Sequence, residues 1–387
     1  MFIATASASA DESDWRTSWD GTLYGYASRM TLRDDSVLNP NNQIAQLPER
    51  SEVAEFRFNI KAENEIVRFT ARPIASLRSA QHESYVSQWQ VRVAAVEGWN
   101  VAAGREVMNW GAAQFRSPSS PFYFDNGRSD PMRELVGMDN IKLTWTPDMR
   151  SSATLARIVR SGYGAAEPDP WRDSWLVKLD QRGDEWVYGL VAVKAPELPA
   201  FYGANAQYTL SDTLLLYGEL GSSAQTSGLV SPADVMLPFS LRTTSPRRTT
   251  ALAGAAYTFE NGQSVNAEYL HESHGYTRAE AEAYFARAAA SPLWAGMALG
   301  YAPRLLGRDY LHLVWQSNMM ESDHYWRAMF THNVTDGSNE LGAYGEKTLN
   351  PHLSLFATLV LNGGSARQEM SALFTRSATA GLKVALP

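Results

Sequence analysis

Apolar and polar residues alternate along most of this chain. Phe56, Phe58 and Ile60, for example, are separated by Arg57 and Asn59. Successive side chains of a strand point to opposite sides, so this period of two predicts a strand with one apolar face. The segments that we expect to form strands are 19–33, 51–62, 65–78, 85–97, 100–111, 139–147, 151–163, 171–181, 185–195, 200–210, 213–225, 249–260, 263–275, 306–318, 324–334, 340–348, 352–362 and 373–386.

The connections between these segments fall into two classes. Every second one is short and rich in turn-forming residues. The remaining ones include all the long loops, which are 34–50, 112–138, 226–248 and 276–305. Barrels of the outer membrane alternate short periplasmic turns with longer extracellular loops in this way. The sequence therefore predicts an all-β fold, a transmembrane antiparallel up-and-down β-barrel of about 18 strands with short periplasmic turns and long extracellular loops.

The composition argues against several other classes of protein. Charged residues make up 19% of the 387 residues, and no stretch of ~18 uncharged apolar residues could form a membrane-spanning helix. The chain has no cysteine, which excludes disulfides and cysteine-based metal sites. The formal net charge of −7 gives no basic surface for nucleic acid, so we expect no nucleic-acid partner.

The sequence also lacks the usual signatures of enzymes. It contains no Gly-x-Ser-x-Gly elbow, phosphate loop or dinucleotide fingerprint. His271 and His274 are expected to point to opposite faces at the end of a strand, which does not suit a metal ion. We therefore expect no enzyme activity, no metal and no cofactor.

The start of the chain has the character of a processed leader. Met1–Ala10 is a short apolar start followed by alternating alanine and serine, a pattern suited to signal peptidase. Residues 1–10 are therefore expected to be a residual signal-peptide-like segment, and residues 11–387 a single outer-membrane barrel domain.

The end of the chain carries a second targeting pattern. Thr379, Gly381, Val384 and Leu386 have the spacing polar-x-Gly-x-x-apolar-x-apolar. This spacing resembles the β-signal that the barrel-insertion machinery recognises. It departs from the usual bacterial form because the chain ends on Pro387 instead of an aromatic residue.

Two features outside the alternation complete the expected architecture. Thr277 and Glu280 form a capping box ahead of an alanine-rich run through Ala290, which predicts a short helix that stiffens or covers an outer loop. Several tryptophans are expected to form girdles at the membrane interfaces. They are Trp110, Trp145, Trp175, Trp186, Trp315 and Trp326.

The polar residues that alternate with the apolar set are expected to line the lumen. In the first half of the chain these are Arg57, Arg68, Arg72, Arg92, Lys142, Arg157 and Lys178, with the acids Glu55 and Asp180. In the second half they are Glu219, Glu268 and Glu346, with the bases Arg327 and Lys383. A basic wall facing a more acidic one would orient and filter charged solutes. The alternative is that these charges pair with one another or only keep the lumen wet.

The segment 104–145 has the most distinctive sequence. Gly104, Arg105, Trp110 and Gly111 precede a charged loop and a returning strand that carries Lys142. The charged residues of the loop are Arg116, Asp125, Arg128, Asp130, Arg133 and Glu134. The segment resembles a group of outer-membrane barrels that includes alginate-export-like porins, in which a Gly-Arg-x-x-x-x-Trp-Gly strand precedes a long charged loop. The resemblance implies an 18-stranded monomeric barrel with a narrowed lumen that selects anionic sugars or small organic solutes.

The loop 112–138 has two possible positions. If it folds inward, its arginines form a constriction with those on the wall, and guanidinium groups suit carboxylates or phosphates. If it folds outward, Pro118, Pro121 and the aromatic residues of 122–124 pack it against neighbouring loops. Arg105 is expected to belong to the same solute path.

Three functions are compatible with these patterns. The first is a porin-like channel of the Gram-negative outer membrane for passive passage of small anionic solutes or saccharides. The second is a barrel with a closed lumen that binds a surface polysaccharide or helps to export or assemble it. The third is a soluble all-β enzyme in which the apolar strand faces form a core. The first two imply outer-membrane lipid, the barrel-insertion machinery and a small solute or saccharide as partners.

Overall fold

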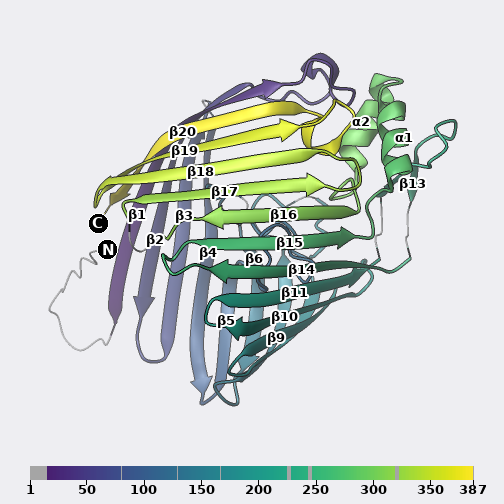
Figure 1. Cartoon of the computed structure of the whole chain (residues 1–387). Helices are drawn as coiled ribbons and strands as arrows, with labels where there is room; N and C mark the ends of the chain where they lie inside the picture. The colour runs from purple at the N-terminus through teal and green to yellow at the C-terminus, as the bar shows by residue number, and fades with distance from the viewer. Residues whose placement is uncertain are drawn as a thin grey trace.

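A closed antiparallel sheet of 18 strands makes up most of the chain (Figure 1). The computed structural model describes residues 15–79, 81–128, 130–165, 167–224, 228–242, 246–318 and 322–386, so the predicted signal-like segment 1–10 lies outside the described residues. The sheet is closed because β1 pairs with both β2 and β20. The predicted antiparallel barrel of about 18 strands is therefore confirmed.

Each strand of the barrel pairs with its neighbour in the chain. The barrel strands are β1 (Arg16–Leu32), β2 (Arg50–Glu63), β3 (Val67–Arg78), β4 (Gln81–Val96), β5 (Trp99–Glu106), β6 (Met138–Trp145), β7 (Ser151–Arg160), β8 (Ser174–Arg182), β9 (Trp186–Lys194), β10 (Phe201–Ser211), β11 (Leu214–Ser223), β14 (Arg248–Thr258), β15 (Ser264–Glu272), β16 (Asp309–Gln316), β17 (His324–Asn333), β18 (Asn339–Asn350), β19 (Leu353–Gly363) and β20 (Phe374–Leu386).

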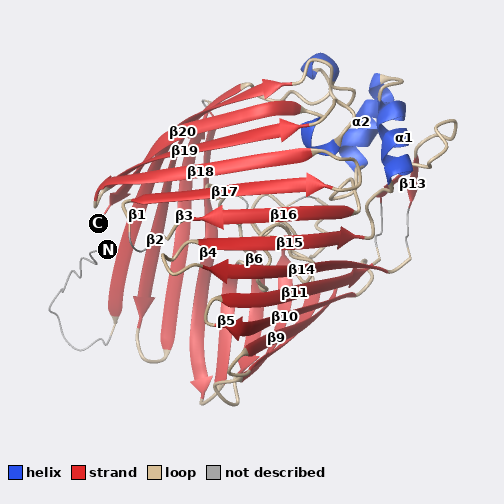
Figure 2. Cartoon of the chain, in the orientation of Figure 1, coloured by secondary structure: helices blue, strands red, loops and turns tan. Residues whose placement is uncertain are grey.

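The two ends of the barrel carry different connections (Figure 2). At one end, which we call the turn end, the connections are 64–66, 97–98, 146–150, 183–185, 212–213, 259–263, 317–323 and 351–352. At the other end, the loop end, they are 33–49, 79–80, 107–137, 161–173, 195–200, 224–247, 273–308, 334–338 and 364–373. The start of β1 and the end of β20 lie at the turn end, opposite the helices (Figure 1).

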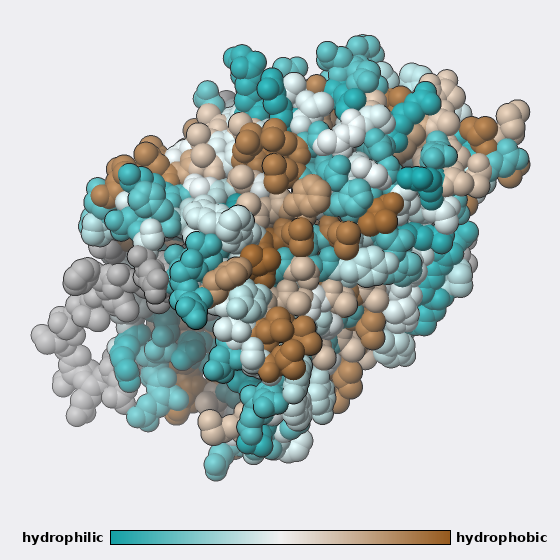
Figure 3. Space-filling model, viewed as in Figure 1, coloured by the Kyte–Doolittle hydropathy of each residue, from teal (hydrophilic) through white to brown (hydrophobic). Residues whose placement is uncertain are grey.

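Side-chain exposure separates the two faces of the sheet. Leu143, Leu155 and Val177 lie side by side on three neighbouring strands and are 37%, 44% and 46% exposed. Ala156 and Ile158, which alternate with Leu155, are 1% and 0% exposed because they face the interior. The apolar set therefore forms the outer surface, where Figure 3 shows it as brown patches across the strands, and the alternate set faces the lumen.

The loop end holds a small subdomain of its own. It consists of α1 (Arg278–Ala288), α2 (Pro292–Tyr301) and the hairpin of β12 (Gly228–Val230) and β13 (Ser240–Arg242). Its core contains Tyr284, Phe285 and Ala295. The capping box at Thr277 and the helix after it are confirmed, whereas α2 and the hairpin were not predicted. Of the helices that the structure describes, none is long and apolar enough to cross a membrane.

Exposed tryptophans gather close to the turn end. Trp99 and Trp145 stack on each other across β5 and β6, and Trp315 contacts Trp326 across β16 and β17. Rings at this level suit a membrane interface, because they combine an apolar body with a polar N–H group. Trp110 does not belong to this girdle, contrary to the prediction, since it leaves the sheet with the loop that follows β5.

Candidate functional site

The loop 107–137, here called the lumen loop, enters the barrel. Strand β5 was predicted to run to residue 111 but ends at Glu106, and the chain then crosses to the opposite wall. There the carboxylate of Glu219 on β11 accepts the backbone N–H of Ala113 at 3.0 Å. Glu219 is 1% exposed and faces inward, because its strand neighbour Leu220 is half-exposed on the outer face. The inward position of this loop, one of the two considered above, is the one observed.

Two glutamates of this wall hold the first part of the lumen loop. The second oxygen of Glu219 accepts the hydroxyls of Ser117 at 2.5 Å and Ser119 at 2.7 Å. Glu268 on β15 accepts the backbone N–H groups of Gln114 at 2.6 Å and Phe115 at 2.9 Å. Charge-assisted hydrogen bonds of this kind are stronger than neutral ones. Two of the three acidic residues predicted for the second half, Glu219 and Glu268, therefore anchor a loop instead of lining an open wall.

Gly111 fits this anchor because it has no side chain. Its φ of +83° is in the left-handed region, and a Cβ atom there would lie 2.1 Å from Oε1 of Glu219. Gly111→Ala is therefore expected to loosen the loop, since the left-handed backbone alone costs about 1–3 kcal/mol and the clash adds to it. Limited trypsin digestion should then cut at Arg116 and Arg128 faster than in the parent protein.

Gly164 provides the matched control for this substitution. It also has a positive φ, +72°, but nothing lies within 4 Å of its Cβ position. Gly164→Ala should leave the cleavage rate at the lumen loop unchanged. Equal rates for Gly111→Ala and the parent protein would contradict the anchoring role of Glu219.

The last part of the lumen loop is held by the other side of the barrel, the wall formed by β2, β3 and β4. Glu134 is 8% exposed and lies 3.4 Å from a guanidinium nitrogen of Arg57 on β2 and 3.2 Å from one of Arg72 on β3. The hydroxyl of Ser87 on β4 donates to the same carboxylate at 3.1 Å. Arg57 also donates to the carbonyl oxygen of Met132 at 2.8 Å. The loop is thus tied to both walls and spans the lumen.

Within the lumen loop, Arg128 connects the middle of the loop to its first part. Its guanidinium donates to the carbonyl oxygens of Ala113 and Gly111 at 2.7 and 3.1 Å. Tyr123 donates its hydroxyl to the carbonyl oxygen of Val136, and burial raises the pKa of that hydroxyl. These bonds satisfy polar groups that an apolar environment would penalise, so they fix the shape of the loop.

The remaining predicted loop residues form one charged group. Asp125 lies 2.5 Å from a nitrogen of Arg133 and 3.6 Å from one of Arg116. The Arg116 guanidinium also lies over the ring of Phe115, 4.5 Å from its centre. Two cations thus lie within 4.0 Å of one carboxylate on the loop-end side of the lumen loop.

Arginines continue along the basic wall from the lumen loop to the turn end. Arg57 and Arg72 lie beside Glu134, and Arg68 and Arg92 lie directly opposite each other on β3 and β4, nearer to the turn end. We call these four residues the arginine ladder. Arg68 has one carboxylate partner, Glu63 at 2.8 Å, and no carboxylate among the described residues lies within 4.0 Å of Arg92. Their sequence-predicted inward orientation agrees with the register of β2, β3 and β4.

Other predicted lumen charges occur as local pairs. Lys142 on β6 contacts both carboxylate oxygens of Glu106, at 2.5 and 2.6 Å. Lys383 lies 3.2 Å from Glu346, and Lys178 pairs with Asp180. This pairing is the alternative considered from the sequence, and it leaves the arginine ladder as the main basic feature of the lumen wall.

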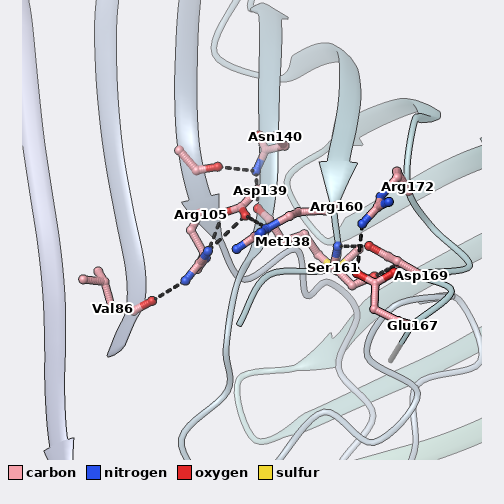
Figure 4. Close-up of polar contacts among 11 residues, drawn as sticks. Val86, Arg105, Met138, Asp139, Asn140, Arg160, Ser161, Glu167, Asp169 and Arg172 are labelled. Carbon is pink, nitrogen blue, oxygen red and sulfur yellow. Dashed lines mark hydrogen bonds and ion pairs between the residues drawn. The ribbon is translucent and has the colours of Figure 1, made fainter. Parts of the chain in front are cut away.

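Arg105 belongs to the outward-facing set of β5, contrary to the prediction, and Figure 4 shows its contacts with Val86 and Asp139. Its neighbours Gly104 and Glu106 face the lumen, and two consecutive strand residues cannot share a face. Arg105 contacts Asp139 at 2.7 Å and donates to the carbonyl oxygen of Val86 at 2.8 Å. It therefore connects β4 and β6 beyond the end of β5. The same Asp139 also binds Arg160 at 2.8 Å.

Arg157 is a second correction to the predicted lumen set. It lies opposite Ile141 and Trp175, which are 54% and 50% exposed on the outer face. Its guanidinium pairs with Asp173 at 2.7 Å and lies over the ring of Trp175. The period of two gave the alternation correctly, but the wrong parity was chosen for this strand.

A cavity of about 690 Å³ opens on the loop-end side of the lumen loop. Its charged lining consists of Arg116, Arg133, Arg304, Asp125 and Glu134, and its aromatic lining of Phe122, Tyr123, Phe124 and Tyr163. The guanidinium of Arg304 lies 3.9 Å from the ring centre of Phe124. Three guanidinium groups and two carboxylates thus surround a space with aromatic walls.

Among the charged and aromatic residues of this cavity, the sequence analysis did not identify Arg304 and Tyr163. Arg304 lies in the loop 273–308, which was expected only to stiffen the outer side, and Tyr163 lies at the predicted end of a strand. Tyr163 stacks on Tyr85 with ring centres 4.4 Å apart. No local sequence signal identifies either residue, because each reaches the cavity through a contact between distant loops.

The residues of the predicted β-signal lie on β20. Thr379 and Gly381 face the lumen beside Phe356, and Val384 and Leu386 face outward in the rows of Leu23 and Gly21. The polar and apolar positions of the pattern thus fall on the two faces of the strand. Recognition by the insertion machinery stays a prediction. No cluster of three possible metal-binding side chains occurs in the part of the chain that the structure describes.

Comparison with known proteins gives a likeness of fold. No protein-family model matches the chain, and no curated protein matches its sequence significantly. OccK5 (OpdH) of Pseudomonas aeruginosa is similar in structure, with a TM-score of 0.57 and 9% identity over 96% of this chain and 98% of that one. A triple mutant of the Rhodopseudomonas blastica porin has a TM-score of 0.50 and 12% identity over 96% and 100%. The chain therefore has the fold of bacterial porins.

Proposed function

We propose that this protein is a porin-like channel of the Gram-negative outer membrane through which small anionic solutes or saccharides diffuse. The observation that carries the proposal is the lumen loop, which is tied across the barrel beside the arginine ladder. Barrels of ~16 to 18 strands are wide enough for water, whereas ~8 strands are filled by their own side chains. A loop held inside such a barrel narrows the path of a solute through the lumen. This function requires no covalent or catalytic step.

The arrangement of cations supports a preference for anions. Arg92 has no carboxylate within 4.0 Å among the described residues, and Arg68 and Arg72 are partly exposed, at 51% and 33% of their side chains. Guanidinium groups bind carboxylates and phosphates through paired N–H donors. An anion that passes the lumen loop would therefore meet one guanidinium after another on its way to the turn end.

The cavity at the loop end supports small saccharides or organic acids as the solute class. Its aromatic walls offer stacking surfaces, and Arg116, Arg133 and Arg304 offer donors to a carboxylate. The resemblance of the segment 104–145 to alginate-export-like porins agrees with an anionic saccharide. Outer-membrane location is part of this proposal and rests on the apolar outer surface and the porin fold.

Conductance across planar lipid bilayers tests the proposal. We expect the purified protein to produce ohmic current steps, and a reversal potential displaced toward anion preference under a salt gradient. The same detergent solution with heat-unfolded protein is the control and should give no steps. Silent bilayers, or a preference for cations, would count against the proposal.

The second candidate function is a closed barrel that binds or helps to export a surface polysaccharide. The fixation of the lumen loop at both walls favours it, because a permanently blocked lumen would still leave the loop-end cavity open to a saccharide. Saccharide binding by a protein that gives silent bilayers would support this candidate.

A further inference from the structure

Three arginines gather on the outer face of the barrel close to the loop end. Arg29 on β1 and Arg50 on β2 lie directly opposite each other, and Arg376 on β20 lies opposite Thr31, two residues beyond Arg29. All three side chains are exposed. They point outward because the residues between them in the alternation, such as Ser28 and Thr379, face the lumen.

These arginines lack acidic partners. Among the residues that the structure describes, no carboxylate oxygen lies within 4.0 Å of their guanidinium nitrogens, and Arg376 donates only to the hydroxyl of Thr31 at 3.1 Å. Glu52 lies one row closer to the turn end, so one negative charge opposes three positive ones. Like charges directly opposite each other destabilise a strand pair unless an anion compensates them.

The level of the arginines corresponds to a membrane surface. Trp19, near the turn end of β1, is 54% exposed on the same face. From Trp19 to Arg29 the strand rises about 25 Å along the barrel axis, at ~3.3 Å per residue and a tilt of ~40°. This distance equals the height of the apolar band of such barrels, roughly 25 Å. The arginines therefore lie where lipid headgroups begin.

A groove of small side chains runs beside these arginines. One row across five strands consists of Gly345, Ala357, Ala380, Ala27 and Glu52, and the next of Ala343, Leu359, Ala378, Arg29 and Arg50. Six of these ten residues are alanine or glycine, and they leave a surface groove of about 740 Å³ across β18, β19, β20, β1 and β2. Figure 1 shows β18, β19 and β20 side by side at this wall.

We infer that this groove binds a phosphorylated lipid of the leaflet at the loop end, with its phosphate against Arg29, Arg50 and Arg376 and one acyl chain along the alanine row. The inference rests on the proposed membrane location but not on the lumen. The apolar groove complements the chain and the unpaired guanidinium groups complement the phosphate. Basic clusters beside membrane-spanning segments bind anionic headgroups, with about 1 kcal/mol for each arginine.

The test uses the full-length protein in detergent and native mass spectrometry, with dioleoyl phosphatidic acid as probe. We expect the parent protein to retain this lipid and the triple variant Arg29→Ala, Arg50→Ala, Arg376→Ala to bind it about 100-fold more weakly. Ala27→Leu with Ala380→Leu fills the groove and should also weaken binding, although all three arginines remain. Dioleoylglycerol, which has no phosphate, and inorganic phosphate, which has no chain, should each compete poorly.

Arg157→Ala provides the matched control, since Arg157 faces outward but already has Asp173 as partner. This variant should bind the lipid as the parent does. Equal lipid binding by the parent and the triple variant, or effective competition by inorganic phosphate, would overturn the inference. Crosslinking of two copies through Ala357→Cys would also overturn it, because a second barrel would then occupy the groove. Bilayer conductance of the triple variant should be unchanged, which separates this inference from the channel proposal.

Discussion

Replacement of Glu219 and Glu268 by alanine is expected to widen the channel. Together these carboxylates accept four backbone N–H groups and two serine hydroxyls of the lumen loop. A hydrogen bond to a charged group contributes ~1.5–3 kcal/mol, so the loop loses most of what holds it to this wall. We expect single-channel conductance to rise and current noise to increase, because the freed loop moves within the lumen.

The graded and control variants make this prediction specific. Glu268→Gln keeps the size and one acceptor oxygen, so its effect should be smaller than that of Glu268→Ala. Glu346→Ala removes another inward glutamate, one that pairs with Lys383 and does not bind the loop, and should leave conductance close to the parent value. An unchanged conductance in the double alanine variant would show that the loop does not limit ion flow.

Removal of Arg68 and Arg92 is expected to reduce anion preference. Neither residue binds the lumen loop, so the path should keep its width while losing two positive charges. Two unit charges ~4 Å apart interact by about 1 kcal/mol in water, and such a difference changes an equilibrium about fivefold. The anion-to-cation permeability ratio of Arg68→Ala, Arg92→Ala should therefore fall by about fivefold, measured from reversal potentials.

Ionic strength and charge-preserving substitutions provide the controls. The effect should be large near 0.1 M salt and shrink near 1 M, where the screening length falls to ~3 Å. Arg68→Lys with Arg92→Lys should retain the preference, and Arg157→Ala on the outer face should not alter it. A ratio that does not change in the alanine variant would mean that permeating ions do not pass the arginine ladder.

The barrel could be predicted because the pattern that identifies its strands lies within each short stretch of sequence. Alternation such as that of Phe56 and Arg57 reports the two faces of a strand directly, and the parity of connections gave the topology. The rule failed where the chain left the sheet. Residues 107–111 were assigned to the strand that precedes them, but Met108 and Trp110 belong to the lumen loop, where Trp110 donates to the carbonyl oxygen of Ser119 at 2.9 Å.

The sequence predicted which charged residues belong to the site, but not which residues they contact. The charged residues of the lumen loop were identified, and the glutamates of the second half were expected to face inward. That Glu219 and Glu268 would hold Ala113 and Phe115 could not be read from the sequence, because more than 100 positions separate the partners. Arg105 was misplaced although the outward residues Trp99 and Val101 precede it on the same strand, because the alternation that they set was not carried on to Arg105.

The pairing of β1 with β20 determines when the fold can be completed. Gly21 lies opposite Leu386, so the first strand to be synthesised meets its second neighbour only after the last one exists. Until then β1 has a free edge of N–H and C=O groups, which in water invites aggregation and in lipid cannot be tolerated. Contacts between such distant residues also form slowly. We therefore expect the chain to need protection by other molecules between its synthesis and the closure of the barrel.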